Sequence, residues 1–183
     1  MKFFLLSILL IVGFTNSISA ETRSQGKNIS DWHVYTKIKG EITKGTFDTI
    51  IFSGKKMETG YKLNLSHREA TKINWEMEFT EFYAVYLEVK TTNGTRTLRY
   101  TSLDEDIGKK NGYINFGLGS NSLKMYVAIS RDIEKDVEKF EAGNKLISID
   151  KMLVRGSGAI GNIKTIFKLE EKVIENATNN IKN

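Results

Sequence analysis

The chain has 183 residues, a formal net charge of +5 and no cysteine. The absence of cysteine excludes disulfides, a thiol nucleophile, thiolate metal sites and lipid attachment through cysteine. The small excess of Lys and Arg is spread over turns such as "KGEITKG" and "GKKNG" rather than gathered on one face, which argues against a nucleic-acid partner.

The first predicted element is a signal peptide. The apolar run "FFLLSILLIVGF" follows Lys2 and precedes the small polar stretch "TNSISA". This order predicts a secretory signal peptide over residues 1–20, with cleavage after Ser19 or Ala20. An uncleaved membrane anchor would need about 20 apolar residues, more than this run has. We therefore expect a secreted or periplasmic protein with a net charge of +4 and no membrane span after signal removal.

Strand-like segments then follow one another along the chain. "DWHVYTKI", "DTIIFSG" and "GYKLNL" come first, and "INWEMEF" at 73–79 alternates apolar and polar residues strictly. Alternation of this kind predicts a strand with one buried and one wet face, and it places Trp75 inside. We also place Trp32 in the core.

A hairpin is predicted next. "FYAVYLEVK" and "TRTLRYTS" flank a turn that contains Asn93 and Gly94, and an Asn-Gly pair is the strongest short hairpin signal. "GYINFGL" and "KMYVAIS" are further strands. With the two strands near the C-terminus, nine or ten short strands predict an all-β, jelly-roll-like antiparallel β-sandwich over residues 21–169.

One segment has a helical period. In "SRDIEKDVEKFEAGN", Ile133, Val137 and Phe140 recur at helical spacing, with Ser130 placed to cap the start and Gly143 to end it. A helix of about ten residues is marginal alone, so we expect it to cover a sheet edge or end. His67 falls in a predicted polar loop, and residues 170–183 form a polar C-terminal tail.

Three glycines near the end have the spacing of a dinucleotide-binding loop. Gly156, Gly158 and Gly161 follow the strand-like run "KLISIDKMLV". A nucleotide site would need a helix after the loop and an acidic residue about 20 positions later. The residues that follow, "NIKTIFKL", alternate like a strand. The sequence therefore predicts a tight connection between the last two strands, and no nucleotide partner.

Several motifs resemble a known domain type. They are "DWHVY", "GYKLNL", "INWEMEF", "YLEVKTTNGTRTLRYTS", "GYINFGLGS", "SRDIEKDV" and "MLVRGSGAIGNI". In order and spacing, residues 31–166 resemble a domain of secreted and surface bacterial proteins that is akin to jelly-roll carbohydrate-binding modules. The resemblance implies the fold, and it implies glycan binding without catalysis.

The chain departs from that family at two places. Related domains tend to have histidines where Asn115 and Phe116 stand, and an acidic pair where Gly161 and Asn162 stand, in a final strand near a structural calcium. Calcium requires several oxygen ligands, so the loss of these carboxylates weakens the expectation of an inherited calcium ion.

Catalytic and metal-binding patterns are sparse. Asp104, Glu105 and Asp106 are weak candidates for calcium ligands or for a carboxylate of glycoside hydrolysis, and a solvated turn is the favoured interpretation. His33 and His67 are too few for a histidine metal site. No nucleophile elbow, zincin motif or phosphate-binding loop is present. We expect a protein that is not an enzyme and has no obligatory cofactor.

A glycan-binding module needs aromatic rings and a few polar groups. The candidate ligand-binding residues are Tyr86, Arg99, Tyr100, Tyr113, Asn115, Phe116 and Arg155. Each has a structural alternative, since strand aromatics are usually core or cross-strand pairs and Arg155 could pair with the acids at 104–106. "GYINFGLGS" is the preferred binding loop.

Two functions of different class remain open. The first is a non-catalytic module that binds a polysaccharide or envelope glycan. The second is a protein-interaction or structural module of the cell envelope with no sugar ligand. A solvent-facing aromatic pair beside polar groups would favour the first, and a flat apolar patch or an unpaired edge strand the second.

Overall fold

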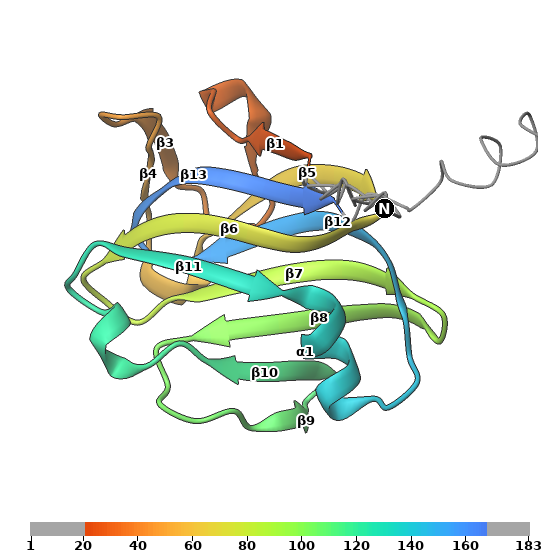
Figure 1. Ribbon diagram of the computed structural model, residues 1–183. Helices are drawn as coiled ribbons and strands as arrows, with labels where there is room; N and C mark the ends of the chain where they lie inside the picture. The colour runs from red at the N-terminus through yellow and green to blue at the C-terminus, as the bar shows by residue number, and fades with distance from the viewer. Residues whose placement is uncertain (1–20, 168–183) are drawn as a thin grey trace, which may run out of the picture.

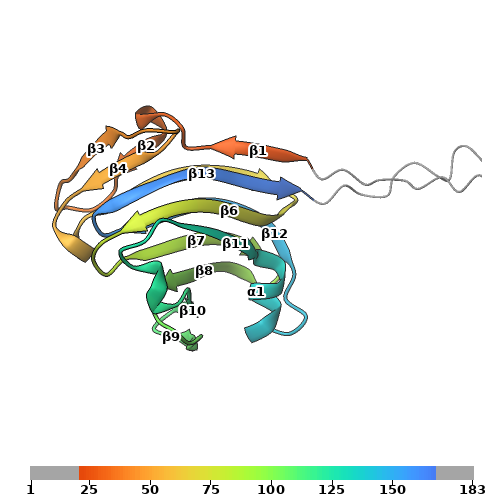
Figure 2. The same cartoon turned by 60° about the vertical axis from the view of Figure 1, so that its left-hand side comes forward.

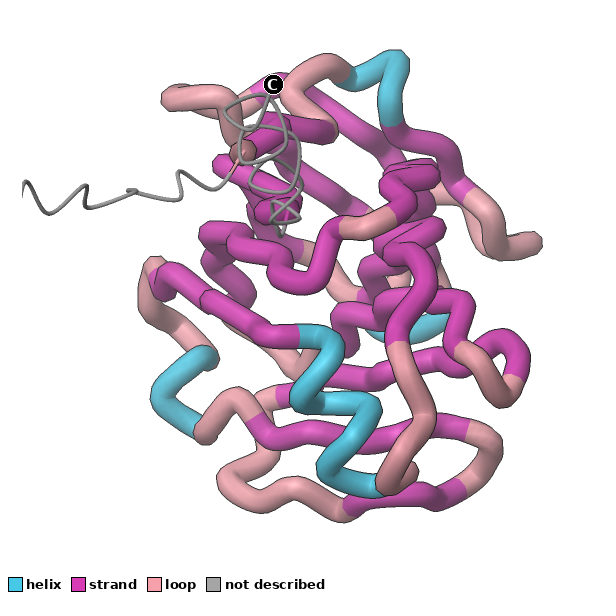
Figure 3. The backbone as a smooth tube through the Cα atoms, turned by 45° about the vertical axis from the view of Figure 1, so that its right-hand side comes forward, coloured by secondary structure: helices cyan, strands magenta, loops and turns pink. Residues whose placement is uncertain are grey.

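The computed structural model describes residues 21–167, in which strands make up most of the backbone (Figure 3). The predicted signal peptide, the last two residues of the predicted domain and the predicted tail lie outside this range. Two β-sheets pack face to face, as Figures 1 and 2 show. The predicted all-β sandwich with one short helix is confirmed.

One sheet has six strands, and its central strand β13 pairs with β6 on one edge and with both β4 and β1 on the other. In spatial order, its strands are β11 (Val127–Asp132), β6 (Ala70–Phe79), β13 (Gly158–Phe167), β4 (Ile50–Ser53) and β3 (Glu41–Lys44), with β1 (Thr22–Gln25) beside β13.

The other sheet has seven strands, and all its pairs are antiparallel except β8 with β10, which run parallel. In spatial order, its strands are β2 (Trp32–Val34), β5 (Gly60–Arg68), β12 (Leu146–Arg155), β7 (Ala84–Thr91), β8 (Gly94–Thr101), β10 (Tyr113–Gly117) and β9 (Gly108–Lys110).

The core lies between the two sheets and follows the alternation of the sequence. Trp75 and its inward neighbours on β6 are at most 1% exposed, and so are Val85 and Leu87 on β7. Trp32, from β2, packs edge-on against Phe52. Because successive side chains of a strand point to opposite faces, the residues between these positions form the outer faces of the sandwich.

Local predictions are mostly confirmed. Thr92 and Asn93 form the turn between β7 and β8, and Gly94, the first residue of β8, has a φ of +96°. Gly156, at a φ of +109°, and Ser157 connect β12 to β13, so the glycine motif joins two strands as predicted. Three short strands, β1, β3 and β9, were not predicted, because their three or four residues are mostly polar and show no apolar alternation.

Two boundaries differ from the predictions. Helix α1 (Ile133–Phe140) begins after Asp132, whose carboxylate accepts the Lys135 N–H. Ser130 is not the cap because it lies inside β11, opposite Asn74. His67 lies in β5 rather than in a loop, since the turn to β6 consists of Glu69 alone. Short 3-10 turns at Ile29–Asp31 (η1), Lys56–Glu58 (η2) and Ser120–Ser122 (η3) complete the described elements.

Candidate functional site

The outer face of the seven-stranded sheet brings together most of the predicted site residues. The strand register aligns one row across six strands, formed by His33, Lys62, Leu153, Tyr86, Arg99 and Asn115. Partners directly opposite each other in a sheet share a face. Tyr86 is therefore central, with an arginine on one side and a leucine on the other.

Three tyrosine rings lie on this face. Tyr86 and Tyr113 are half-buried, and their ring centroids are 5.5 Å apart at an interplanar angle of 55°. Tyr35, 36% exposed, follows β2 and lies over Gly60 of β5. A Cβ atom at residue 60 would come within 2.5 Å of the Tyr35 ring, so this close approach requires glycine.

Two arginines lie among these rings. Arg155 stands opposite Gly60; its Nε donates to the Tyr35 hydroxyl at 3.0 Å and its Nη1 to the Met57 carbonyl at 3.1 Å. Arg99 stands opposite Tyr86, and its Nε is buried without a hydrogen-bond partner among the described residues. Arg99 thus has a donor that the protein leaves unused. We call Tyr35, Tyr86, Arg99, Tyr113 and Arg155 the tyrosine–arginine face.

Burial and the neighbouring positive charges shift the pKa of Tyr86 in opposite directions. Burial raises the pKa of the Tyr86 hydroxyl, and the positive charges of Arg99 and Arg155 act against that rise. The Tyr86 hydroxyl is therefore neutral at physiological pH and can donate a hydrogen bond. Rings that present an apolar surface beside guanidinium donors are suited to a ligand with both apolar and hydroxyl-bearing surfaces.

Tyr100 and Phe116 do not belong to this face, which corrects the prediction that they contact a ligand. Tyr100 is fully buried and Phe116 is 1% exposed, and their rings stack in the core with centroids 5.1 Å apart. They alternate with Arg99 and Asn115 along β8 and β10, so they must point to the inner side. The Tyr100 hydroxyl donates to Asp136 on α1 at 2.7 Å.

Asn115 points to the outer side, but the N–H donors of its amide are already used. It is 7% exposed, and its Nδ2 donates to the carbonyl groups of Gly108, Lys110 and Tyr113 at 2.9 to 3.2 Å. The predicted binding loop "GYINFGLG" is largely strand β10. Asn115 therefore positions the turn from β9 to β10, and thereby Tyr113, rather than presenting a free amide.

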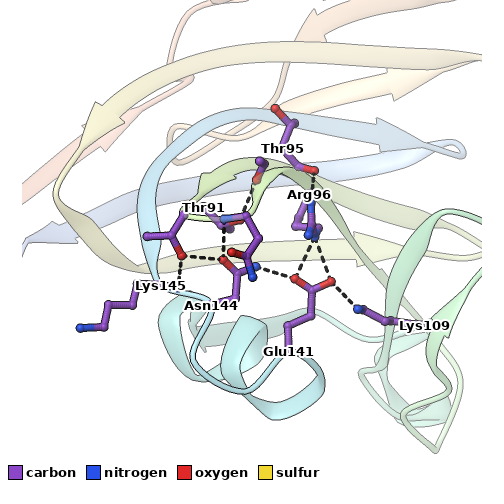
Figure 4. A network of polar contacts seen from close by, with 10 residues as sticks. Thr91, Thr95, Arg96, Lys109, Glu141, Asn144 and Lys145 are labelled. Carbon is purple, nitrogen blue, oxygen red and sulfur yellow. Dashed lines mark hydrogen bonds and ion pairs between the residues drawn. The ribbon is translucent and has the colours of Figure 1, made fainter.

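A polar network around Glu141 joins β8 and β9 to the segment after α1 at this edge of the sheet (Figure 4). The Glu141 carboxylate, 6% exposed, accepts from Lys109 of β9 at 2.6 Å, from Arg96 of β8 at 2.8 Å and from Asn144 at 2.5 Å. Burial alone would raise its pKa, but these three donors outweigh burial and hold the pKa of Glu141 at about 2. Asn144 also accepts from the Asn93 N–H at 3.0 Å, so the network reaches the β7–β8 turn.

The acidic run before β9 stabilises its own loop. The Asp104 carboxylate accepts the Ser120 N–H at 2.7 Å, and Asp106 accepts the Gly117 N–H at 2.9 Å and pairs with Lys139 at 2.7 Å. Arg155 pairs with none of these acids, since it bonds to Tyr35 and Met57. Within residues 21–167, no three His, Asp or Glu side chains are placed to hold a metal ion.

Three residues of this face were not predicted as site residues: Tyr35, Lys62 and Leu153, which share it with Tyr86 and Arg155. Lys62 and Leu153 alternate with the buried residues Leu63 and Val154, so period-2 alternation is a signal that could have found them. Tyr35 carries no such signal, because it lies just beyond β2.

Comparison with protein-family models and with curated proteins found no match. Among solved structures, this chain is similar to carbohydrate-binding modules. A family 11 module of a cellulosomal cellulase of Clostridium thermocellum is 14% identical, with 85% of this chain and 99% of that chain covered and a TM-score of 0.46.

Two further modules match in the same way. A family 29 module complexed with cellulohexaose is 8% identical, with 81% of this chain and 92% of that chain covered and a TM-score of 0.45. A family 15 xylan-binding module is 11% identical, with 84% and 99% covered and a TM-score of 0.44. What these modules bind is a property of those proteins. The function of this chain must therefore be inferred from the tyrosine–arginine face itself. No helix within residues 21–167 is long and apolar enough to cross a membrane.

Proposed function

We propose that this protein is a secreted or periplasmic, non-catalytic glycan-binding module that lays a polysaccharide across the tyrosine–arginine face. The observation that carries this proposal is the Tyr86–Tyr113 ring pair beside Arg99, whose buried Nε lacks a partner among the described residues. Rings supply apolar contact to the faces of sugars, and charged donors supply hydrogen bonds to hydroxyl or acidic groups.

The dimensions of the face support an extended ligand. Tyr35 lies over β5 and Tyr113 is on β10, four strands further across the sheet. Neighbouring strands are about 4.8 Å apart, so the rings are distributed over about 20 Å. A polysaccharide with several sugar rings in a row fits such a span. The face also lacks paired carboxylates at its centre, where Tyr86 and Arg99 lie, and this favours binding over glycoside hydrolysis.

The experiment that tests this proposal compares two tyrosine variants. Binding of purified protein to a panel of soluble and insoluble polysaccharides is measured by affinity electrophoresis and calorimetry, with and without calcium. Tyr86→Ala should weaken binding at least tenfold, because Tyr86 would supply the central aromatic contact. Tyr126→Ala serves as the control, because Tyr126 is 57% exposed beside the six-stranded sheet.

Circular dichroism and thermal melts establish that both variants are folded. Equal affinity of Tyr86→Ala and the unmodified protein would move the binding site away from this face. No binding to any polysaccharide by folded protein would reject the proposal and favour the alternative, an envelope protein-interaction module. Phe47, 92% exposed at the turn between β3 and β4, would then be the first position to mutate.

A further inference from the structure

The tyrosine–arginine face carries an excess of positive charge. Two lysines join its arginines: Lys62 stands opposite Leu153 in the row that contains Tyr86, and Lys110 stands opposite Tyr113. Lys151 lies one position along the same face, opposite Glu88. These strands therefore place five cationic side chains around the three rings, together with Glu88. The ion pair of Lys90 with Asp150 lies further along β7 and β12, and Glu141 lines the pocket that Tyr113 and Lys110 share.

The nearby carboxylates are all paired with other cations, Glu141 with Arg96 and Lys109 and Asp150 with Lys90. Glu88 forms an ion pair with Lys151. Arg155 bonds only to a hydroxyl and a carbonyl, which carry no formal charge. Among the described side chains, no carboxylate forms an ion pair with Lys62, Arg99, Lys110 or Arg155. Four positive charges thus surround the rings without an anionic partner.

The outer face of the six-stranded sheet differs. There β6 presents Lys72, Asn74, Glu76 and Glu78 between its buried residues. Lys72 forms an ion pair with Asp132 of β11. Hydrogen bonds from Tyr126 and Asn162 lower the pKa of Glu76 most, and the positive charge of Lys164 lowers it further. Charges of both signs alternate on this second face. The positive excess is therefore a property of the tyrosine–arginine face and not of the whole surface.

A half-buried guanidinium without an anion is costly unless a ligand completes it. Arg99 lies between Tyr86 and Asn115, and the amide of Asn115 is committed to three backbone carbonyls, so neither neighbour offers it an anion. An arginine fork binds the two oxygens of a carboxylate or sulfate with charge-assisted hydrogen bonds. Because Arg99 is adjacent to the Tyr86 ring, an acidic group on a sugar stacked there would lie within its reach.

We infer that the polysaccharide bound by this face is acidic, with carboxylate or sulfate groups that contact Arg99 and the surrounding cations. The inference rests on the proposed function and names the class of ligand. A matched pair of ligands tests it: polygalacturonate and its methyl ester have the same backbone and differ in charge. A sulfated galactan and its unsulfated galactan form the second pair and separate sulfate from carboxylate as the source of charge.

At low ionic strength, at least one acidic chain is expected to bind about tenfold more tightly than its uncharged partner. This advantage should vanish in 1 M NaCl, where the Debye length is only about 3 Å. Arg99→Gln should remove the advantage, because the acidic chain should lose about tenfold more affinity than the uncharged one. Lys164→Gln deletes a charge on the opposite sheet and should leave both affinities unchanged.

Lys110→Gln is the second variant, to be used if Arg99→Gln does not fold, because Lys110 is exposed. Equal binding of charged and uncharged partners, still lost in Tyr86→Ala, would overturn the inference and leave the proposed function standing. Equal losses in Lys164→Gln and Arg99→Gln would also overturn it, since attraction would then be nonspecific. No binding to any chain would reject the proposed function, and the inference with it.

Discussion

Strands β8 and β10 lie between two clusters of aromatic rings and arginine, one on each side of their sheet; the inner cluster includes Arg131 from β11, and the outer cluster includes Tyr86 from β7. On the inner side, Arg131 lies 5.2 Å from the centroid of the Tyr100 ring and 5.1 Å from that of Phe116, and pairs with Asp136 through two bonds of 2.5 and 2.9 Å. On the outer side, Arg99 lies beside Tyr86 without an anion.

The presence or absence of an internal anion distinguishes structural from functional residues of the same chemical type. The inner cluster supplies its own anion, and burial together with Asp136 raises the pKa of Tyr100 well above its ordinary value. Both the Arg131 guanidinium and the Tyr100 hydroxyl bond to the Asp136 carboxylate. The outer cluster combines the same groups but omits the anion. A site that omits a partner for a charged group is suited to take that partner from a ligand.

The largest change in stability is expected on strand β10, where one residue of each cluster can be compared. Phe116→Ala should lower the free energy of unfolding by about 4 kcal/mol, because it opens a cavity among buried rings. Tyr113→Ala, three residues earlier on β10, should lower it by only about 1 kcal/mol while weakening glycan binding. Urea denaturation and affinity electrophoresis of both variants provide the measurements. A stable Phe116→Ala protein that has lost binding would reverse the assignment of these two residues.

The next largest change in stability is expected when the anion of the inner cluster, Asp136, is removed. Asp136→Ala leaves Arg131 and the Tyr100 hydroxyl without their partner, and it should cost about 3 kcal/mol of stability, as breaking a buried ion pair does. Glu138→Ala, an exposed change on the same helix, should stay within about 0.5 kcal/mol. Denaturation midpoints of the two variants measure this. Comparable midpoints would mean that the inner pair contributes little.

The smallest change in stability is expected for the polar network around Glu141. The pKa of Glu141 is about 2, below its ordinary value of 4.5, so its contribution is full above pH 4.5 and is lost as pH falls toward 2. Glu141→Gln should therefore be about 2 kcal/mol less stable at neutral pH, and the gap to the unmodified protein should close between pH 4.5 and 2.

Unfolding curves across that pH range check this expectation. Glu58→Gln provides the control, since the Glu58 carboxylate is 55% exposed and its pair with Lys55 is a surface pair that contributes little. A gap for Glu141→Gln that stays constant with pH would show that the carboxylate charge is not what stabilises the network.

The fold could be predicted because its signals are local. Alternation along β6 sets which side chains are buried, and Asn93-Gly94 sets the β7–β8 turn, so both could be predicted from a few neighbouring residues. The glycine connection between β12 and β13 was predicted for the same reason. The short strand β9 could not be predicted, because three residues carry no period and their pairing depends on β10.

The candidate site was predicted only in part, because a ligand-binding face is set by register between distant strands. Tyr86, Arg99, Tyr113 and Arg155 do share one face. Tyr100 and Phe116 were wrong for a reason the sequence contains: each is adjacent to another candidate in the same strand, and neighbours in a strand cannot point the same way. That the amide nitrogen of Asn115 is already bonded depends on three carbonyls brought together by the fold.

The positions of the two tryptophans have a practical consequence. Trp32 and Trp75, the only tryptophans in the chain, are 2% and 1% exposed, whereas every ring of the tyrosine–arginine face is a tyrosine. Indole fluorescence will therefore follow the loss of the core and stay insensitive to a ligand on the outer face. Ultraviolet difference spectra of the tyrosines will respond to that ligand. One sample thus offers two independent optical signals, one for unfolding and one for occupancy.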